Sequence, residues 1–255
     1  MNSSPQCAIV MPAYNEEACI GPVCLEWLRL SGERGFLMIV VDDGSRDRTG
    51  TLLDALAREH RELRVIHQPN QGHGAAVLRG YQQALEAGAH WIFQVDSDGQ
   101  FTPGDFAALF NERAHAEYLL GFRRLRRDPW LRKLLSCVNR TMMSLIFGVR
   151  LRDPNAPYRL MSAHLMRRLL PYLPPGLFAP NVFLAAMAAG AGFAVIEIPV
   201  SHRERLTGAA SIGAWRALVV GVRCIAEMLQ FRREVYPTFL RVERGANIDR
   251  QRLQT

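Results

Sequence analysis

Lysine is nearly absent from this chain of 255 residues: Lys133 is the only one, and arginine carries almost all of the positive charge. The five cysteines are odd in number and none stands in a C-x-x-C spacing, which indicates neither a disulfide framework nor a zinc site. We therefore expect a protein of a reducing compartment.

Other absences narrow the classes of protein further. No glycine-lysine-serine/threonine run occurs, which excludes a P-loop. Residues 1–6 are polar and lead into no apolar leader segment, so we expect no signal peptide. The uncharged stretch at residues 177–196 is about the length of a bilayer span. Because a proline and two glycines interrupt it, it predicts a helix, a turn and a strand instead.

The overall composition is that of an ordinary globular protein. Hydrophobic residues make up 49% of the chain and charged residues 22%. The length suffices for one large α/β domain, and no stretch reads as a linker between two cores. We predict a single domain over residues 1–235 and a frayed polar tail over residues 236–255.

The net charge of +7 is unevenly distributed. A basic segment at residues 123–133 contains Arg123, Arg124, Arg126, Arg127, Arg132 and Lys133. Such a segment can hold phosphate, bind nucleic acid, lie on an anionic membrane or form a solvated face. It lacks the interleaved aromatic residues that stack on bases, so we expect no nucleic-acid partner.

Short apolar runs alternate with helical patterns along the chain. The predicted strands cover residues 7–11, 36–41, 63–67, 91–95, 117–121 and 193–200. Apolar spacing predicts an amphipathic helix at residues 129–147 and another from about residue 211 to 231. The alternation of strand and helix predicts a largely parallel sheet flanked by helices.

Two aspartates follow the predicted strand at residues 91–95. Since the carboxyl ends of parallel strands face the ligand crevice, Asp96 and Asp98 should project into a site. Two carboxylates there suit a divalent cation that itself holds phosphate oxygens. The alternative is an Asx turn, in which both side chains accept hydrogen bonds from nearby backbone groups.

Five short motifs stand in an order and spacing that resembles family-2 glycosyltransferases. They are Pro12 to Glu17, Asp42 to Ser45, Asn70 to Gly74, Asp96 to Gln100 and Asp153 to Arg159. The chain to about residue 231 resembles the polyprenyl-phosphate (dolichyl-phosphate) mannosyl- and glucosyltransferase branch. The resemblance implies a GT-A (Rossmann-like) fold and an inverting transfer of hexose from a nucleotide-diphosphate sugar to polyprenyl phosphate. It also implies a Mg²⁺ or Mn²⁺ cofactor.

The resemblance assigns roles to individual residues. The substrate-binding set would be Pro12, Tyr14, Glu16, Asp42, Asp43, Gly72, Asp96, Arg159, His202 and Arg203. The metal would be held by Asp96, Asp98 and Gln100, and the catalytic set would be Asp153, Arg123 and Arg205. Asp153 would orient or activate the acceptor, with a loop-capping aspartate as the alternative. The arginines would hold phosphate through their fork geometry.

The sequence departs from the family pattern in two places. Pro157 stands where the family has a glycine, which fixes φ in the acceptor loop. The stretch from Arg205 to Ile212 has one more residue than the family's R-x-x-G-x-S-K ending and no lysine. We therefore assign no phosphate role to that last position.

The acceptor and the cellular place of the enzyme are the broadest expectations. The alternative to polyprenyl phosphate is a soluble glycan, lipid or protein acceptor with the same donor chemistry. We expect peripheral membrane contact through the basic and apolar faces of the helices after Arg123. The enzyme should then be cytoplasmic and work at the inner face of the cytoplasmic membrane.

Overall fold

The structure is a computed structural model that describes residues 4–123, 130–203 and 214–243. Of residues 130–136, 139 and 214–218 it describes the backbone alone. Arg205 and the basic residues Arg124, Arg126 and Arg127 therefore lie outside the described residues.

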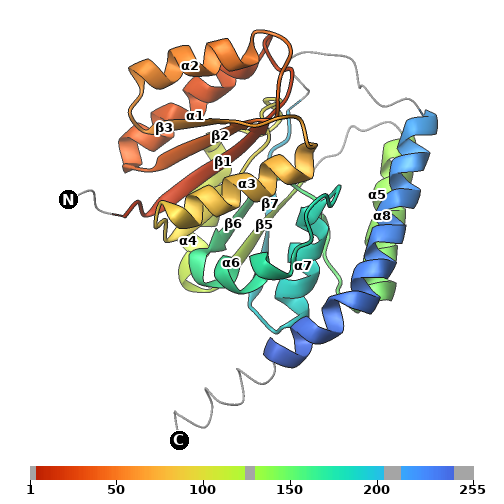
Figure 1. Cartoon of the computed structure of the whole chain (residues 1–255). Coiled ribbons are helices and arrows are strands. Elements are labelled where there is room, and N and C mark those ends of the chain that lie inside the picture. Colours follow the sequence, from red (N-terminus) through yellow and green to blue (C-terminus); the bar gives the residue numbers. More distant parts are fainter. Residues whose placement is uncertain (1–3, 124–129, 204–213, 244–255) are drawn as a thin grey trace, which may run out of the picture.

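The described strands form a seven-stranded sheet in the order β3-β2-β1-β4-β6-β5-β7 (Figure 1). They are β1 (Cys7–Ala13), β2 (Leu37–Asp42), β3 (Leu63–His67), β4 (Trp91–Gln94), β5 (Tyr118–Arg123), β6 (Arg159–Ser162) and β7 (Val195–Val200). All neighbours pair in parallel except β6, which runs antiparallel to β4 and to β5. The prediction of a largely parallel α/β sheet is confirmed.

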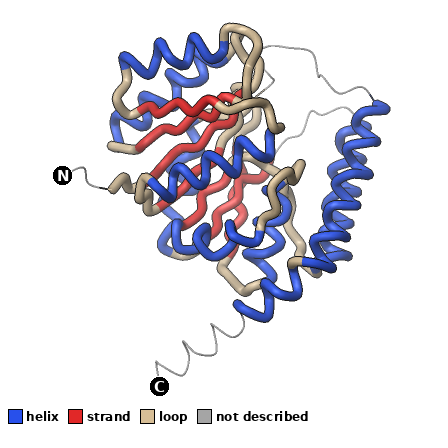
Figure 2. The backbone as a smooth tube through the Cα atoms, viewed as in Figure 1, coloured by secondary structure: helices blue, strands red, loops and turns tan. Residues whose placement is uncertain are grey.

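Helices cover both faces of this sheet (Figure 2). They are α1 (Ile20–Arg34), α2 (Thr49–Glu59), α3 (His73–Glu86), α4 (Phe106–Asn111), α5 (Trp130–Phe147), α6 (Ala163–Leu169), α7 (Pro180–Gly190) and α8 (Ala214–Glu234). Short 3-10 helices lie at η1 (Pro103–Asp105), η2 (Glu112–Ala114) and η3 (Leu170–Tyr172). One core lies between the sheet and α1, α2 and α4, and the other between the sheet and α3, α6 and α7.

The alternation of side chains in β1 joins the two cores. Ala8 and Val10 face α3, whereas Ile9 and Met11 pack on the side of Trp27 from α1. Gly80 lets α3 approach the sheet closely, because a Cβ at this position would collide with the Val10 side chain. Small and branched residues therefore set the distance between helix and sheet.

β1 extends to Ala13, two residues beyond its predicted end, and includes Pro12. The backbone of Val10 faces β4, since its carbonyl accepts a hydrogen bond from the Val95 N–H. Pro12, two residues later, faces the same side, where the pairing with β4 has already ended. The missing N–H of proline thus costs the sheet no hydrogen bond.

α5 and α8 lie side by side at one flank of the sheet (Figure 1). Met143 and Phe147 of α5 and Met228 and Phe231 of α8 join the core around α7. Outward-facing apolar side chains stay exposed on both helices, and the predicted amphipathic character is confirmed. Within the described ranges, none of the helices is both long enough and apolar enough to cross a membrane.

The predicted frayed tail from residue 236 is wrong for residues 236–243, which are helical. Tyr236 and Phe239 are buried, and Glu243 forms an ion pair with Arg168 of α6. The apolar residues of this segment recur at helical spacing, which lets one face pack against α7. Residues 244–255 lie outside the described part of the chain.

Candidate active site

Loops from most strands meet at one edge of the sheet. This edge holds the carboxyl ends of the parallel strands β1, β2, β4, β5 and β7. Because β6 runs in the opposite direction, its amino end, preceded by Asp153, comes to the same edge. The loops gathered there are residues 14–17, 43–48, 95–102, 153–158 and 201–203. This is the crevice position expected for ligands of open α/β sheets.

Asp43 organises the loop between β3 and α3. Its Oδ1 accepts hydrogen bonds from Gln68 Nε2 at 2.7 Å and from the Gln71 N–H at 2.9 Å. Its Oδ2 accepts the Gly72 N–H at 2.8 Å, and the φ of 93° at Gly72 favours glycine. Both carboxylate oxygens of Asp43 therefore act within the chain, and a direct contact with a nucleoside stays a prediction.

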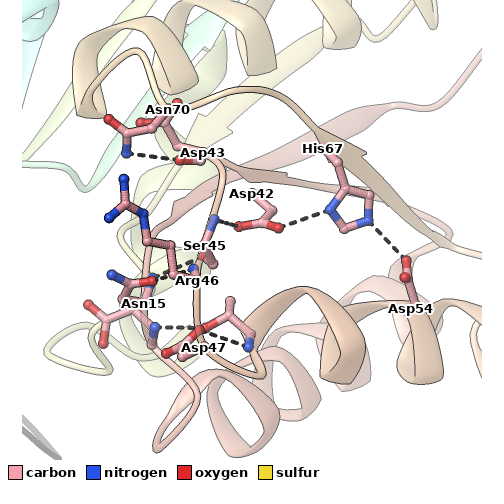
Figure 3. A network of polar contacts seen from close by, with 11 residues as sticks. Asn15, Asp42, Asp43, Ser45, Arg46, Asp47, Asp54, His67 and Asn70 are labelled. Atoms are coloured by element: carbon pink, nitrogen blue, oxygen red, sulfur yellow. Dashed lines mark hydrogen bonds and ion pairs between the residues drawn. The ribbon is translucent and has the colours of Figure 1, made fainter.

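Asp42 leads into a chain of polar contacts that the sequence did not suggest (Figure 3). Its Oδ1 accepts the Ser45 N–H at 3.1 Å, and its Oδ2 lies 2.9 Å from His67 Nδ1. His67 Nε2 lies 3.0 Å from Asp54 Oδ1, and hydrogen bonds to Asp54 and Asp42 raise the pKa of His67. The contact between the two side chains follows from the register of the strands, which places His67 of β3 opposite Asp42 of β2.

The loop after β1 is joined to the loop after β2. Ser45 Oγ accepts the Asn15 N–H at 3.0 Å, and Thr49 Oγ1 accepts the Glu16 N–H at 2.8 Å. Pro12 is buried beneath, whereas Tyr14 is 43% exposed. These contacts fix the backbone of one wall of the site.

The two aspartates after β4 behave differently. Asp98 Oδ1 accepts the Gln100 N–H at 3.0 Å, so Asp98 does close the Asx turn that was the alternative interpretation. Asp96 Oδ1 is buried and, in the part of the chain that the structure describes, lacks a hydrogen-bond partner; His73 Nε2 lies 3.9 Å away. A buried carboxylate oxygen without a donor favours a cation or a ligand donor at this point.

The residues at this turn could supply part of the coordination of a divalent ion. Among the described residues, no group of three or more His, Cys, Asp or Glu side chains could enclose a metal ion. Mg²⁺ is commonly held by one or two carboxylates together with substrate phosphates. Asp96 and Asp98 can supply those carboxylates, while Gln100 fixes the turn through its N–H.

Asp153 and Arg123, both predicted to be catalytic, form a bidentate ion pair. Arg123 Nε lies 2.8 Å from Asp153 Oδ2, and Nη2 lies 3.2 Å from Oδ1. The side chain of Asp153 is only 8% exposed, and that of Arg123 is 19% exposed. The structure thus joins the end of β5 to the loop before β6, a pairing that the sequence did not indicate.

The prediction that Arg159 contacts substrate is not supported by its position, because the residue lies fully buried in the core. Its guanidinium donates to the carbonyls of Pro154, Ala156 and Asn181 and to the Tyr118 hydroxyl. These bonds use all five of its N–H groups. Arg159 therefore supports the loop that carries Asp153.

Glu197 of β7 supports the same loop from the outer side. Its Oε1 accepts the Arg152 N–H at 2.7 Å, and burial raises the pKa of the Glu197 carboxyl. This residue was not predicted from the sequence, because a glutamate in an edge strand is usually solvated. The one indication in the sequence was that Glu197 stands among apolar residues of the strand.

An aromatic cluster lies beneath the site. The Tyr158 ring lies 4.8 Å from that of Phe93 and 5.3 Å from that of Phe101, between ring centroids. The Tyr158 hydroxyl donates to the Thr102 carbonyl at 3.1 Å, and Phe101 contacts the His202 ring. The cluster links the loops that carry Asp98, Asp153 and His202.

The segment after β7 is anchored next to the aspartate turn. The Gln100 carbonyl accepts the Arg203 N–H at 2.8 Å, and Asp105 Oδ2 accepts the Ser201 N–H at 2.7 Å. The Arg203 side chain is 55% exposed and lies 3.5 Å from Glu26 of α1. His202 and Arg203 therefore lie next to the aspartate turn, and their contact with a substrate phosphate stays a prediction. Arg205 lies outside the described residues.

If the nucleotide sugar that the resemblance implies is the substrate, replacing Asp43 by asparagine should raise its KM by about tenfold with a smaller change in kcat. The hydrogen bonds of a charged acceptor are worth about 1.5–3 kcal/mol each. An amide oxygen cannot serve all three donors of the loop. Asp54→Asn, at the exposed end of the His67 contacts, is the matched control and should change KM little. Steady-state kinetics with varied donor check this. An unchanged KM with a collapsed kcat would contradict the role.

Comparisons with known proteins agree with the arrangement of the site. The family described as "Glycosyl transferase family 2" matches residues 8–170. A polyprenol monophosphomannose synthase of Mycolicibacterium smegmatis is 29% identical over 209 residues, which cover 78% of each chain. An undecaprenyl-phosphate mannosyltransferase of Micrococcus luteus is 28% identical over 78% of this chain and 84% of its own length.

A third relative is longer than this chain. The undecaprenyl-phosphate 4-deoxy-4-formamido-L-arabinose transferase of Pseudomonas paraeruginosa is 30% identical over 83% of this chain and 61% of its own length.

The fold also matches solved structures. Glucosyl-3-phosphoglycerate synthase from Mycobacterium tuberculosis, solved with Mn²⁺ and uridine-diphosphate-glucose, aligns with a TM-score of 0.64 at 20% identity. The alignment covers 89% of this chain and 79% of the other. It shows a shared GT-A fold, and the family match extends over more than half of the chain. The chain belongs to glycosyl transferase family 2.

Proposed function

We propose that this glycosyltransferase moves a hexose from a nucleotide-diphosphate sugar to a polyprenyl phosphate, with inversion at the sugar carbon. The observation that carries the proposal is that two pairs of charged residues, one suited to each substrate, lie at the same edge of the sheet. Asp96 and Asp98 suit the diphosphate side, and the Arg123 and Asp153 pair suits the acceptor side. Relatives named for polyprenol and undecaprenyl phosphate support the acceptor class.

On the donor side, the chain supplies a wall and two carboxylates. Tyr14 and Glu16 lie in the loop fixed to residues 45–49, and Asp42 and Asp43 hold the neighbouring loops in place. A bound Mg²⁺ or Mn²⁺ would supply positive charge where the departing diphosphate becomes more negative. Asp96 and Asp98 would hold that ion, which agrees with the unsatisfied buried oxygen of Asp96.

On the acceptor side, a phosphate monoester is already a nucleophile near neutral pH and needs positioning more than deprotonation. One of its oxygens forms the new bond to the sugar C1 carbon. The bond between C1 and the diphosphate oxygen breaks, and its electron pair leaves with the nucleoside diphosphate. Asp153 holds Nε and Nη2 of Arg123, which leaves Nη1 to donate to the acceptor phosphate.

Contact with the surface of the cytoplasmic membrane is part of the proposal, because a polyprenyl phosphate is presented at headgroup level. The exposed apolar side chains of α5 and α8 support such contact. We place the enzyme at the inner face of that membrane, where nucleotide sugars are available.

The experiment is a panel of nucleotide sugars with and without a short polyprenyl phosphate, in which released nucleoside diphosphate is measured. We expect that one nucleotide sugar releases nucleoside diphosphate, and that this release requires the lipid phosphate and Mg²⁺ or Mn²⁺. Equal release without the lipid, or release only with a soluble sugar acceptor, would refute the proposed acceptor.

A further inference from the structure

A pocket of about 460 Å³ opens between α5 and β7 and borders the candidate site only through Arg152 and Glu197, whose contact supports the loop that carries Asp153. Its polar lining comes from the carboxyl-terminal half of α5, from the segment that leads to Asp153, and from β7. These residues are Arg140, Thr141, Ser144, Arg150, Arg152 and Glu197. Three arginines thus face one glutamate around a single opening.

None of these three guanidinium groups is paired with a carboxylate among the described residues. The contact of Arg140 is a weak one of 3.9 Å to Cys137 Sγ, and Arg152 stacks on the Phe122 ring at 4.6 Å. Arg150 is exposed and makes no hydrogen bond or ion pair with any described residue. The Glu197 carboxylate accepts the Arg152 N–H, and the charge of Arg152 also acts on it, so the positive charge of Arg152 is partly balanced.

This combination of groups matches a phosphate ester. Guanidinium groups donate to phosphate oxygens through paired N–H groups, and the hydroxyls of Thr141 and Ser144 are further donors. Burying the positive charge without an anion would be unfavourable, but the pocket is open to solvent at Arg140 and Arg150. An anion can therefore enter without rearrangement of the helix.

The surroundings of the pocket indicate what the anion is attached to. Leu145, which also lines the pocket, is 72% exposed, and Val138 lies two turns earlier on α5 and is also exposed. The partner helix α8 exposes Val219, Val222 and Leu229. An apolar face next to a cluster of arginines is complementary to a lipid whose headgroup carries the negative charge.

We propose that this pocket binds the phosphate of an anionic phospholipid headgroup, with the exposed apolar side chains of α5 and α8 facing the acyl region. The inference rests on the proposed membrane contact and gives it a defined site. Arg152 directly precedes Asp153, so a lipid bound here places the acceptor side of the active site at the height of the headgroups.

The test compares two double variants with equal loss of charge. Arg140→Gln/Arg150→Gln removes two arginines from the pocket. Arg61→Gln/Arg64→Gln removes two exposed arginines, one just before β3 and one within it, at the other edge of the sheet. Binding is measured by flotation with vesicles of equal parts phosphatidylglycerol and phosphatidylcholine. We expect the pocket variant to bind about 30-fold more weakly, as two arginines at an anionic surface predict, and the control to bind like the parent.

Two further measurements separate the alternatives. Short-chain phosphatidylglycerol below its micelle concentration should bind the parent and fail to bind the pocket variant. If inorganic phosphate displaces it at equal concentration, the site is one for free phosphate and the lipid assignment is overturned. Equal losses in both double variants, or none in either, also overturn it.

Sugar transfer to a short, water-soluble acceptor distinguishes this inference from the proposed function. The pocket variant should keep parental activity with that acceptor, because Arg140 and Arg150 do not touch the proposed active site. If the parent shows no transfer to any acceptor while the lipid-binding difference persists, the proposed function fails and the lipid site stands. Thermal melting of both variants confirms that each is folded.

Discussion

Replacing Asp98 by asparagine is expected to lower kcat by about 100-fold or more, the scale of loss when a preorganised group that stabilises developing charge is removed. The fold should survive, because the asparagine Oδ1 can still accept the Gln100 N–H that closes the turn. A neutral amide cannot replace the carboxylate's hold on a divalent cation. The loss should therefore appear together with a higher Mn²⁺ concentration for half-maximal activity.

The matched control is Asp47→Asn. Asp47 Oδ1 accepts the Thr49 N–H at 2.9 Å, so this residue closes the same kind of turn after a different strand. It should retain most of the parental activity and an unchanged metal requirement. Turnover of the Asp98 variant at the parental rate, with the parental dependence on metal, would remove Asp98 from the site.

Asp153→Asn is expected to slow transfer by about 100-fold and to lower the free energy of unfolding by about 3 kcal/mol, since it removes one partner of a largely buried pair. Arg123 would be left without its counter-charge and without the bidentate contact that orients it. Because Asp153 acts through Arg123 in this account, the acceptor KM should rise while the donor KM changes less.

A double-mutant cycle with Arg123→Lys checks the pairing. If both residues act as one unit, the double variant should transfer sugar almost as fast as the less active of the two single variants. Additive losses would show that Asp153 and Arg123 act independently. The loss of one limb of the pH profile in Asp153→Asn alone would instead assign Asp153 as a general base.

Much of the fold follows from local sequence. The parallel strands were predicted from short apolar runs that stop at Asp42 and Asp96, and each continues into a loop at the same edge. β6 was not among the predicted strands, and its direction was not predictable, because it has only four residues and its orientation comes from pairing with β4 and β5. Such pairing is a tertiary effect that periodicity does not encode.

The site was predictable where a motif sits at a strand end and unpredictable where side chains act across the chain. Asp96 and Asp98 were located by their strand, and their neighbours His202 and Arg203 lie near them. Arg159 was given a substrate-binding role from the resemblance of its motif, whereas the structure buries its side chain completely, because a motif does not show whether a side chain faces the site or the core. Its partners are mostly backbone carbonyls, which leave no trace in the sequence.

The most direct test of the central claim is ³¹P NMR of the lipid product formed from the active nucleotide sugar and polyprenyl phosphate. Attack of the acceptor phosphate on the sugar carbon predicts a single phosphodiester signal, with the nucleoside diphosphate released intact. The sugar proton coupling should show the anomeric configuration opposite to that of the donor. A lipid diphosphate, formed with release of nucleoside monophosphate, or a product that keeps the donor configuration would contradict the account.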